Sequence, residues 1–176
     1  MAQNLVAADS REVETFLEKD LEDFVTFLVG GQLFGIPILK VQDILRLEYI
    51  APIPLAPPRV IGSINLRGRI VTVVSVRVCL GIKDRDEDAM SHKKNPPEAS
   101  KKEKKDMGVT VEYDHDLYTL LVDSVGEVVS VSSEFHEGNP STLDASWREF
   151  ALGVYRLEDR LMVVLDVERL LGFNTR

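Results

Sequence analysis

The sequence predicts an all-β protein made of two small β-barrels, with only short helices. Two features of the chain carry this prediction. Short apolar runs alternate with turns marked by glycine and proline, and the same pattern of runs returns in the second half of the chain. Small barrels expose fewer strand edges than one open sheet of many short strands, so barrels are the favoured arrangement.

The clearest element is a hairpin between Val60 and Leu80. Two runs of β-branched and apolar residues flank the polar turn Asn65–Gly68, a pattern typical of a hairpin with largely buried strands. Arg67 then lies at the tip, with no carboxylate in the adjoining turn. Its planar guanidinium suits bidentate recognition or the bracing of a neighbouring loop, whereas the alternative is an ordinary solvated arginine.

The hairpin is repeated at Gly153–Gly172, which matches Gly62–Gly81 at a fixed offset (153 − 62 = 91). Identical residues stand at the pairs Gly62/Gly153, Leu66/Leu157, Arg69/Arg160, Val73/Val164, Val76/Val167, Leu80/Leu171 and Gly81/Gly172. This similarity indicates a duplicated unit. The counterpart of Arg67 is Glu158, so the two tips carry opposite charge on a shared scaffold. Such divergence favours different partners for the two halves.

The first half of the chain opens with a predicted strand at Phe24–Val29, a turn at Gly30-Gly31 and a return strand at Leu33–Ile38. Pro37 places the return strand near a sheet edge or marks its end. Lys40–Leu45 is expected to form a short helical turn or a bend. An extended crossing into the hairpin is then enforced by four prolines, Pro52, Pro54, Pro57 and Pro58.

The second half opens in the same way, with a strand at Val109–Tyr113, a turn at Asp114–Asp116 and a return through Leu117–Val128. Val125 matches Val41 at a second offset (125 − 41 = 84), so the repeat extends to this region. Because the two offsets differ (91 − 84 = 7), the connection between hairpins is longer in the second half.

This longer connection contains Pro140–Phe150, which is expected to hold a short capped helix. Trp147 and Phe150 would form its packing face rather than stack on a ligand.

Two segments differ from the repeated core. Residues 1–22 are mixed and acidic and are interpreted as a tail or one short helix. Residues 83–107 carry an acidic cluster followed by a lysine-rich stretch, which has almost nothing to bury and predicts a surface loop between the halves. The alternative for this loop is a charged docking arm. A single domain of two intertwined barrels is therefore expected over residues 23–175.

Composition limits the classes of function. The chain has 176 residues, is 44% hydrophobic and has a formal net charge of -8, which argues against nucleic acid as a partner. Its one cysteine, Cys79, falls in a predicted buried strand, so no intramolecular disulfide forms and a reducing, cytoplasmic setting is expected. No signal peptide or long apolar run is apparent, so we expect a protein that is neither secreted nor inserted in a membrane.

The sequence offers no recognisable catalytic constellation. Its three histidines have no evident partners, and it lacks phosphate-binding loops, nucleophile elbows and paired cysteines. A carboxylate set of Asp43, Glu127 and Asp166 is the remaining catalytic alternative. We therefore expect no enzyme activity, no metal and no cofactor.

Several motifs together resemble the CheW family of chemotaxis coupling proteins. They are Phe24–Phe27, Phe34–Ile38, Lys40–Ile44, Gly62–Val71, Val122-Asp123 with Val125, and Gly153–Leu171, in the expected order. The Asn-Leu-Arg-Gly turn in this setting is the most specific of them. The resemblance implies a pair of SH3-like five-stranded barrels. It also implies a noncatalytic adaptor that couples chemoreceptors to the histidine kinase CheA, binding the regulatory domain of that kinase.

The resemblance also implies where partners bind. By motif position, the receptor-facing residues would be Val41, Asp43, Gly62, Arg67 and Gly68, and they would hold the helical signalling tip of a receptor in a groove. The kinase contacts are not assigned to residues. The implied location is cytoplasmic, at receptor arrays on the inner membrane, where contacts between copies of the adaptor are also expected. The competing hypothesis is a β-barrel module that binds a small molecule or peptide in the cleft between the barrels.

Three positions depart from the family pattern. Ser75 replaces the usual aspartate after a strand, and Thr119 and Ser124 stand where glycines are frequent. These changes concern the shape of the groove and the choice of partner more than the fold.

Overall fold

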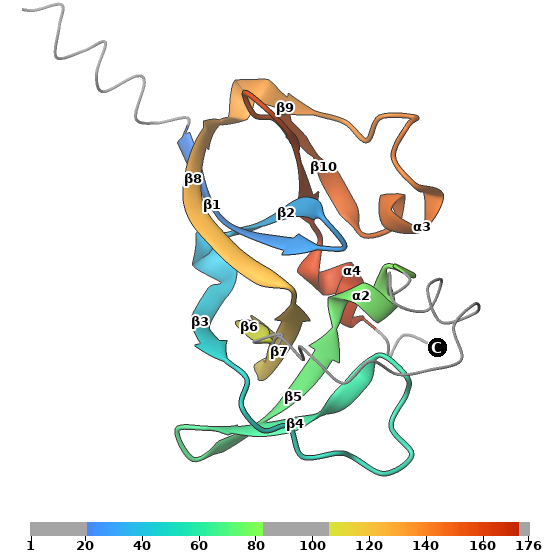
Figure 1. The fold of residues 1–176 in the computed structure, drawn as a ribbon. Coiled ribbons are helices and arrows are strands. Elements are labelled where there is room, and N and C mark those ends of the chain that lie inside the picture. Colours follow the sequence, from blue (N-terminus) through green and yellow to red (C-terminus); the bar gives the residue numbers. More distant parts are fainter. Residues whose placement is uncertain (1–20, 83–105, 173–176) are drawn as a thin grey trace, which may run out of the picture.

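The computed structural model describes residues 21–82 and 106–172. Most of this part of the chain is strand, arranged in two sheets with short helices α2 and α4 between them (Figure 1). The strands are β1 (Leu21–Val29), β2 (Gln32–Pro37), β3 (Val41–Arg46), β4 (Val60–Leu66), β5 (Arg69–Ser75), β6 (Met107–Tyr113), β7 (Asp116–Val122), β8 (Ser124–Ser132), β9 (His136–Glu137), β10 (Ala151–Arg156) and β11 (Leu161–Leu165). The helical elements are η1 (Ile38–Lys40), α2 (Val76–Cys79), η2 (Ser133–Phe135), α3 (Ala145–Arg148) and α4 (Val167–Leu171).

The two halves of the repeat exchange strands. The first sheet has the order β8-β1-β2-β11-β10-β9, and the second has the order β3-β6-β7-β5-β4. The first sheet thus joins the opening hairpin of the first half to four strands of the second half, and the second sheet joins the opening hairpin of the second half to three strands of the first. The parallel pairs β11–β2 and β5–β7 are the seams of this exchange. The fold is the all-β, two-subdomain SH3-like arrangement that the sequence predicts, and we call the subdomains the first and second barrel after their sheets.

The two copies of the repeated hairpin have the same irregularity. In β4 the register shifts between Val60 and Gly62, and in β10 it shifts between Ala151 and Gly153. A Cβ at Gly62 would lie 2.3 Å from the carbonyl oxygen of Ala51, and one at Gly153 would lie 2.6 Å from that of Glu137. Neither position has room for a side chain, because a neighbouring strand segment approaches the backbone. This close approach explains why both copies have glycine there.

The predicted β4–β5 hairpin is confirmed, but its second strand ends earlier than expected. Val76–Cys79 forms helix α2 rather than strand, so Cys79 lies partly exposed on a helix instead of in a buried strand. Ser75 begins the helix because its Oγ accepts a hydrogen bond from the backbone N–H of Val78. In the other copy Asp166 begins α4 in the same way. Serine therefore replaces aspartate without loss of the cap.

The expected bend at Lys40–Leu45 is only partly correct. The bend is the single turn η1, and Val41–Arg46 continues as strand β3, paired with β6. The chain crosses here from the first sheet to the second. A return crossing occurs at Asp123, between β7 and β8, so the predicted single run Leu117–Val128 is two strands in different sheets. No glycine or proline stands between Leu117 and Ser124, which hides the second crossing in the sequence.

Three apolar clusters stabilise this arrangement. The largest lies between the sheets and includes Phe27, Phe34 and Leu120. A second lies within the first barrel around Phe24, and a third within the second barrel around Val71. Because side chains of both sheets form the largest cluster, burial of apolar surface couples the two barrels.

The predicted capped helix is confirmed as α3. Asp144 accepts a hydrogen bond from the backbone N–H of Ser146, and Trp147 packs edge-on against Phe34 at a ring distance of 5.7 Å. Trp147 and Phe150 both contact the cluster between the sheets, as expected. The predicted tail and charged loop lie almost wholly outside the described residues, except that Leu21 and Glu22 belong to β1 and Met107 begins β6.

Candidate adaptor surface

The tip of the β4–β5 hairpin is built by a two-residue turn. Arg67 and Gly68 both have positive φ, 53° and 85°, which is the conformation that matches the twist of a tight hairpin. Asn65 Oδ1 accepts a hydrogen bond of 2.8 Å from the backbone N–H of Gly68 and holds the turn closed. The turn therefore presents the Arg67 side chain from a fixed backbone.

Arg67 is not an isolated arginine, because its Nη2 lies 2.9 Å from Asp43 Oδ2. The Arg67 side chain is 81% exposed, whereas the Asp43 side chain is 22% exposed. The carboxylate is thus seated in the protein and the guanidinium covers it from the solvent side. An exposed pair of this kind adds little to stability, about 0.5 kcal/mol. Most donors of the guanidinium remain directed to the surface, where they can meet a partner.

This ion pair joins two strands at opposite ends of the second sheet. Asp43 belongs to β3 and Arg67 follows β4, and these strands are the two edges in the strand order. Leu45 and Leu47 also pack on the interior cluster formed by Ile64 and its neighbours. These contacts bring the two edges together, as closure into a small barrel requires. The sequence alone does not indicate this pair, because Asp43 lies far from the turn along the chain.

The other three predicted site residues have different surroundings. Gly68 is exposed in the same turn as Arg67. Gly62 is buried beneath Ala51, so it shapes the segment that precedes β4 instead of offering a surface. Val41 is partly buried at the start of β3 and packs against the cluster between the sheets. The structure therefore brings Asp43, Arg67 and Gly68 to one surface and places Val41 and Gly62 in its support.

The tip of the other barrel has a different form. A longer connection joins β10 to β11, and Arg160 donates to both carboxylate oxygens of Asp159 within it. These hydrogen bonds lower the pKa of the Asp159 carboxyl below its usual value. Arg160 thus forms its ion pair with the preceding residue in sequence, whereas Arg67 pairs with a residue of a distant strand.

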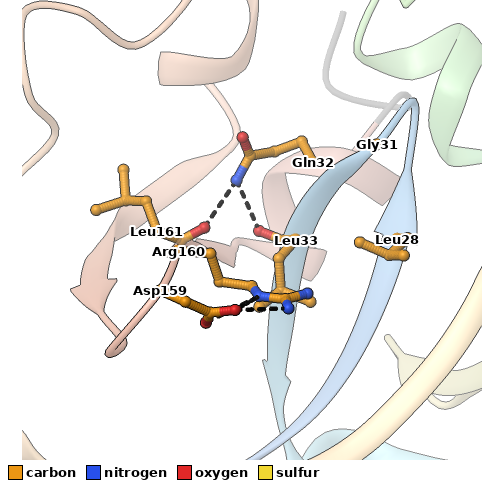
Figure 2. A pocket seen from close by; sticks show the side chains of 7 residues that line it. All are labelled: Leu28, Gly31, Gln32, Leu33, Asp159, Arg160 and Leu161. Carbon is orange, nitrogen blue, oxygen red and sulfur yellow. Dashed lines mark hydrogen bonds and ion pairs between the residues drawn. The ribbon is translucent and has the colours of Figure 1, made fainter.

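A pocket of about 280 Å³ lies beside this second tip. Its lining comes from the β1–β2 and β10–β11 turns, and Figure 2 shows Gln32 directed at the Leu33 and Leu161 carbonyl oxygens. Its polar groups are mostly engaged with each other, so it has few free groups to orient a small molecule.

The carboxylates considered for catalysis have separate structural partners. Asp43 pairs with Arg67, and Asp166 begins α4 and lies 3.2 Å from Arg169 Nε. Glu127 lies in β8 of the other sheet. In the part of the chain that the structure describes, no group of three or more His, Cys, Asp or Glu side chains is placed to hold a metal ion. Among the same residues, no helix is both long and apolar enough to cross a membrane.

Comparison with known proteins agrees with this geometry. A family model described as the CheW-like domain matches residues 23–173. A chemotaxis protein CheW of Treponema pallidum is 26% identical over 91% of this chain and 88% of its own length. Another from Klebsiella aerogenes is 26% identical over 86% of this chain and 82% of its own length.

A solved structure is also similar. It is the crystal structure of the scaffolding protein TtCheW from Thermoanaerobacter tengcongensis, with a TM-score of 0.69 and 25% identity. The similarity covers 88% of this chain and 95% of the solved one. Family model, relatives and solved structure thus extend over both barrels. The chain belongs to the CheW-like domain family and is a chemotaxis adaptor of that family.

Proposed function

We propose that this adaptor couples chemoreceptors to the histidine kinase CheA. The observation that carries the proposal is the Arg67–Asp43 pair, because it puts an exposed guanidinium on a rigid turn at one end of the second barrel. The matching position on the first barrel has Glu158 instead. One chain thus offers two similar scaffolds with different tips, which is what binding to two unlike proteins requires.

In this proposal the receptor binds at the surface formed by Asp43, Arg67 and Gly68. Receptor signalling tips of this family's systems are helical hairpins, so the contact is a helix laid against a barrel. The guanidinium would bind a carboxylate or carbonyl oxygen of the helix through two N–H groups. Val41 and Gly62 would act indirectly, by fixing the strands that carry the surface.

The kinase would bind elsewhere on the barrels, through its regulatory domain. Assembly at receptor arrays in the cytoplasm would then rest on many modest contacts acting together, and contacts between copies of the adaptor would add to them.

The test is co-sedimentation with receptor-containing membranes and CheA, followed by kinase activity in the pellet. We expect Arg67→Glu to lose receptor association and kinase activation while its melting temperature changes little, because the ion pair adds little to stability and the Arg67 side chain is exposed. Glu158→Arg is the matched control, since it reverses the charge at the same position of the other tip. It should leave receptor association intact.

Failure of the wild-type chain to bind either a receptor tip or the kinase regulatory domain would reject the proposal. Equal receptor binding by wild type and Arg67→Glu would keep the adaptor but remove Arg67 from its receptor surface.

A further inference from the structure

Asp123 stands at the point where the chain returns from the second sheet to the first. It is the single residue between β7 and β8, and its backbone N–H donates to the Leu28 carbonyl oxygen over 3.0 Å. Its carboxylate Oδ2 accepts a 2.8 Å hydrogen bond from the backbone N–H of Gly30 and also pairs with the Arg77 guanidinium. Three segments that are distant in sequence therefore meet at one carboxylate.

These three segments belong to different barrels. Gly30 is in the β1–β2 turn of the first barrel, and Arg77 is in α2, which follows the last strand of the β4–β5 hairpin of the second. Ile82 closes the same junction, because its Cγ2 would lie 2.6 Å from a Cβ at Gly30. The carboxylate thus ties a turn of one barrel to a helix of the other.

The far end of α2 is tied to the first barrel as well. Trp147 Nε1 and Ser146 Oγ both donate to the Leu80 carbonyl oxygen, over 3.1 and 3.2 Å. Both donors belong to α3, which packs on the first barrel. Helix α2 is consequently fixed to the first barrel at both ends.

The other crossing has a related ion pair of reversed polarity. Glu168 occupies in α4 the position that Arg77 occupies in α2, because the two residues differ by the repeat offset (168 − 77 = 91). It pairs with Lys40, beside the crossing from β2 to β3, at 2.6 Å. The side chains of Lys40 and Glu168 are 45% and 65% exposed, against 18% for Arg77 and 36% for Asp123.

This difference decides which pair holds the barrels. The Arg77 side chain is mostly buried and the Asp123 carboxylate receives a backbone N–H in addition to the guanidinium, so this pair loses less to solvent screening. The Lys40–Glu168 pair is an exposed surface pair, whose contribution is expected to be small.

We propose that Asp123 is a positioning residue that sets the angle between the two barrels. It would thereby set the relative placement of the receptor-binding and kinase-binding surfaces. The effect on joint binding of receptor and kinase rests on the proposed function, whereas the effect on the angle between the barrels does not. Without the Asp123–Arg77 contact the two barrels stay joined by their shared core and rotate more freely. Receptor and kinase still bind their separate surfaces, but the two bound partners are less often held in the relative orientation that joint binding needs.

The experiment measures two quantities in parallel: the distance between the two barrels, and the recruitment of CheA to receptor membranes by the chain. Spin labels are placed at Glu112→Cys in β6 and Glu134→Cys in η2, both exposed, in a Cys79→Ser background of the full chain. Pulsed electron paramagnetic resonance then gives the distance distribution without any partner. Asp123→Asn and Arg77→Gln remove the ion pair, and Glu168→Gln is the matched control at the equivalent helix position.

We expect a broadened or shifted distance distribution for Asp123→Asn and Arg77→Gln, and the wild-type distribution for Glu168→Gln. In unlabelled protein, binding to receptor membranes alone and to CheA alone should change less than about two-fold in the first two variants. Kinase recruitment to receptor membranes should fall about five-fold, the loss that corresponds to about 1 kcal/mol of orientation energy. A merely structural role would lower both single affinities together and would leave the distance distribution of the folded fraction unchanged.

Wild-type distances in both Asp123→Asn and Arg77→Gln would overturn the inference. So would equal changes in all three variants. If the wild-type chain itself fails to bridge receptor and kinase, the adaptor proposal fails, and the distance distributions still decide whether Asp123 fixes the barrels.

Discussion

The interiors of the two barrels show how one repeated backbone is filled in two ways. The first barrel has Tyr155 and Met162 in its interior, where the second has Ile64 and Val71 at positions related by the repeat offset. The backbone positions are kept while the side-chain volumes differ. Interiors are close-packed, so each large residue must be matched by a small one nearby.

In each barrel a glycine makes room for a larger side chain, but the two glycines lie on strands that are not equivalent in the repeat. In the first barrel Phe24 is large and Gly35 leaves room for Met162, whose Sδ would lie 2.7 Å from a Cβ there. At the equivalent positions the second barrel has Gly108 and Thr119, and a Cβ at Gly108 would lie 2.5 Å from Thr119 Cγ2. Large and small residues have thus exchanged strands. Thr119 is accordingly a packing residue, which accounts for its departure from the family's frequent glycine.

The largest loss of stability is expected at Gly62 and Gly153, where both copies have a backbone segment in close contact with the glycine. We expect Gly62→Ala and Gly153→Ala each to lower the free energy of unfolding by about 3 kcal/mol, because the added Cβ meets a backbone carbonyl that cannot easily move. Denaturant unfolding measures the loss. Gly138→Ala is the control, since a Cβ there meets nothing within 4 Å. A cost at only one of the two sites would show that the copies differ in this device.

A second substitution tests a difference between the two copies, because residues 47–59, the described connection of the first half that corresponds to 138–150, contain no counterpart of α3. We expect Trp147→Ala to lower the free energy of unfolding by about 2.5 kcal/mol, through loss of its contact with Phe34 and of its hydrogen bond to the Leu80 carbonyl. Trp147→Phe keeps an aromatic ring and should lose only about 1 kcal/mol for the missing hydrogen bond. Calorimetry of both variants makes the comparison. Equal losses would mean that packing against Phe34 contributes nothing.

A third change concerns a buried pair of hydroxyls in the second barrel. Thr110 Oγ1 and Thr119 Oγ1 lie 2.9 Å apart with no solvent exposure. Thr119→Val should lower stability by about 1.5 kcal/mol, because it leaves the Thr110 hydroxyl without this partner. The double variant with Thr110→Val removes both polar groups and should recover most of that loss. Chemical denaturation of the two single variants and the double variant gives the coupling, and strictly additive losses would contradict the account.

The smallest expected effect is on the acid side of the stability profile. Hydrogen bonds from Ser146 lower the pKa of the Asp144 carboxyl at the start of α3. Because the folded-state pKa lies below the unfolded one, the ionised carboxylate stabilises the fold above its unfolded pKa, and this contribution is lost as the pH falls through the folded pKa. Asp144→Asn keeps a good capping residue and should flatten this part of the melting-temperature profile. An unchanged slope between neutral and acid pH would contradict it.

The sequence predicts the elements of the fold well where the repeat and the turn residues agree. The hairpin with Arg67, the duplicated unit and the capped helix with Trp147 were all accessible from pattern alone. The positions at which the intertwined barrels exchange strands were not, because a crossing such as Asp123 has no adjacent glycine or proline to mark it. The helix at Val76–Cys79 was missed for a similar reason, since β-branched residues favour strand and a serine cap overrides that preference only in context.

The candidate surface was predicted only in part. The motif identified Arg67, Gly68 and Asp43, but it could not tell that Asp43 and Arg67 pair, because that contact depends on closure of the barrel. Gly62 and Val41 share the motif and lie beneath the surface. The ion pairs at the two crossings depend on where the strands are exchanged, which only the three-dimensional structure reveals.

The central claim is that one chain joins two partners through separate surfaces, and a titration tests it most directly. Increasing amounts of the chain are added to fixed receptor membranes and CheA, and the kinase in the pellet is measured. We predict a rise followed by a fall, because excess adaptor occupies receptor and kinase on separate copies and no longer links them. Kinase sedimentation that does not depend on the chain, or that rises and never falls at saturating excess, would contradict the claim.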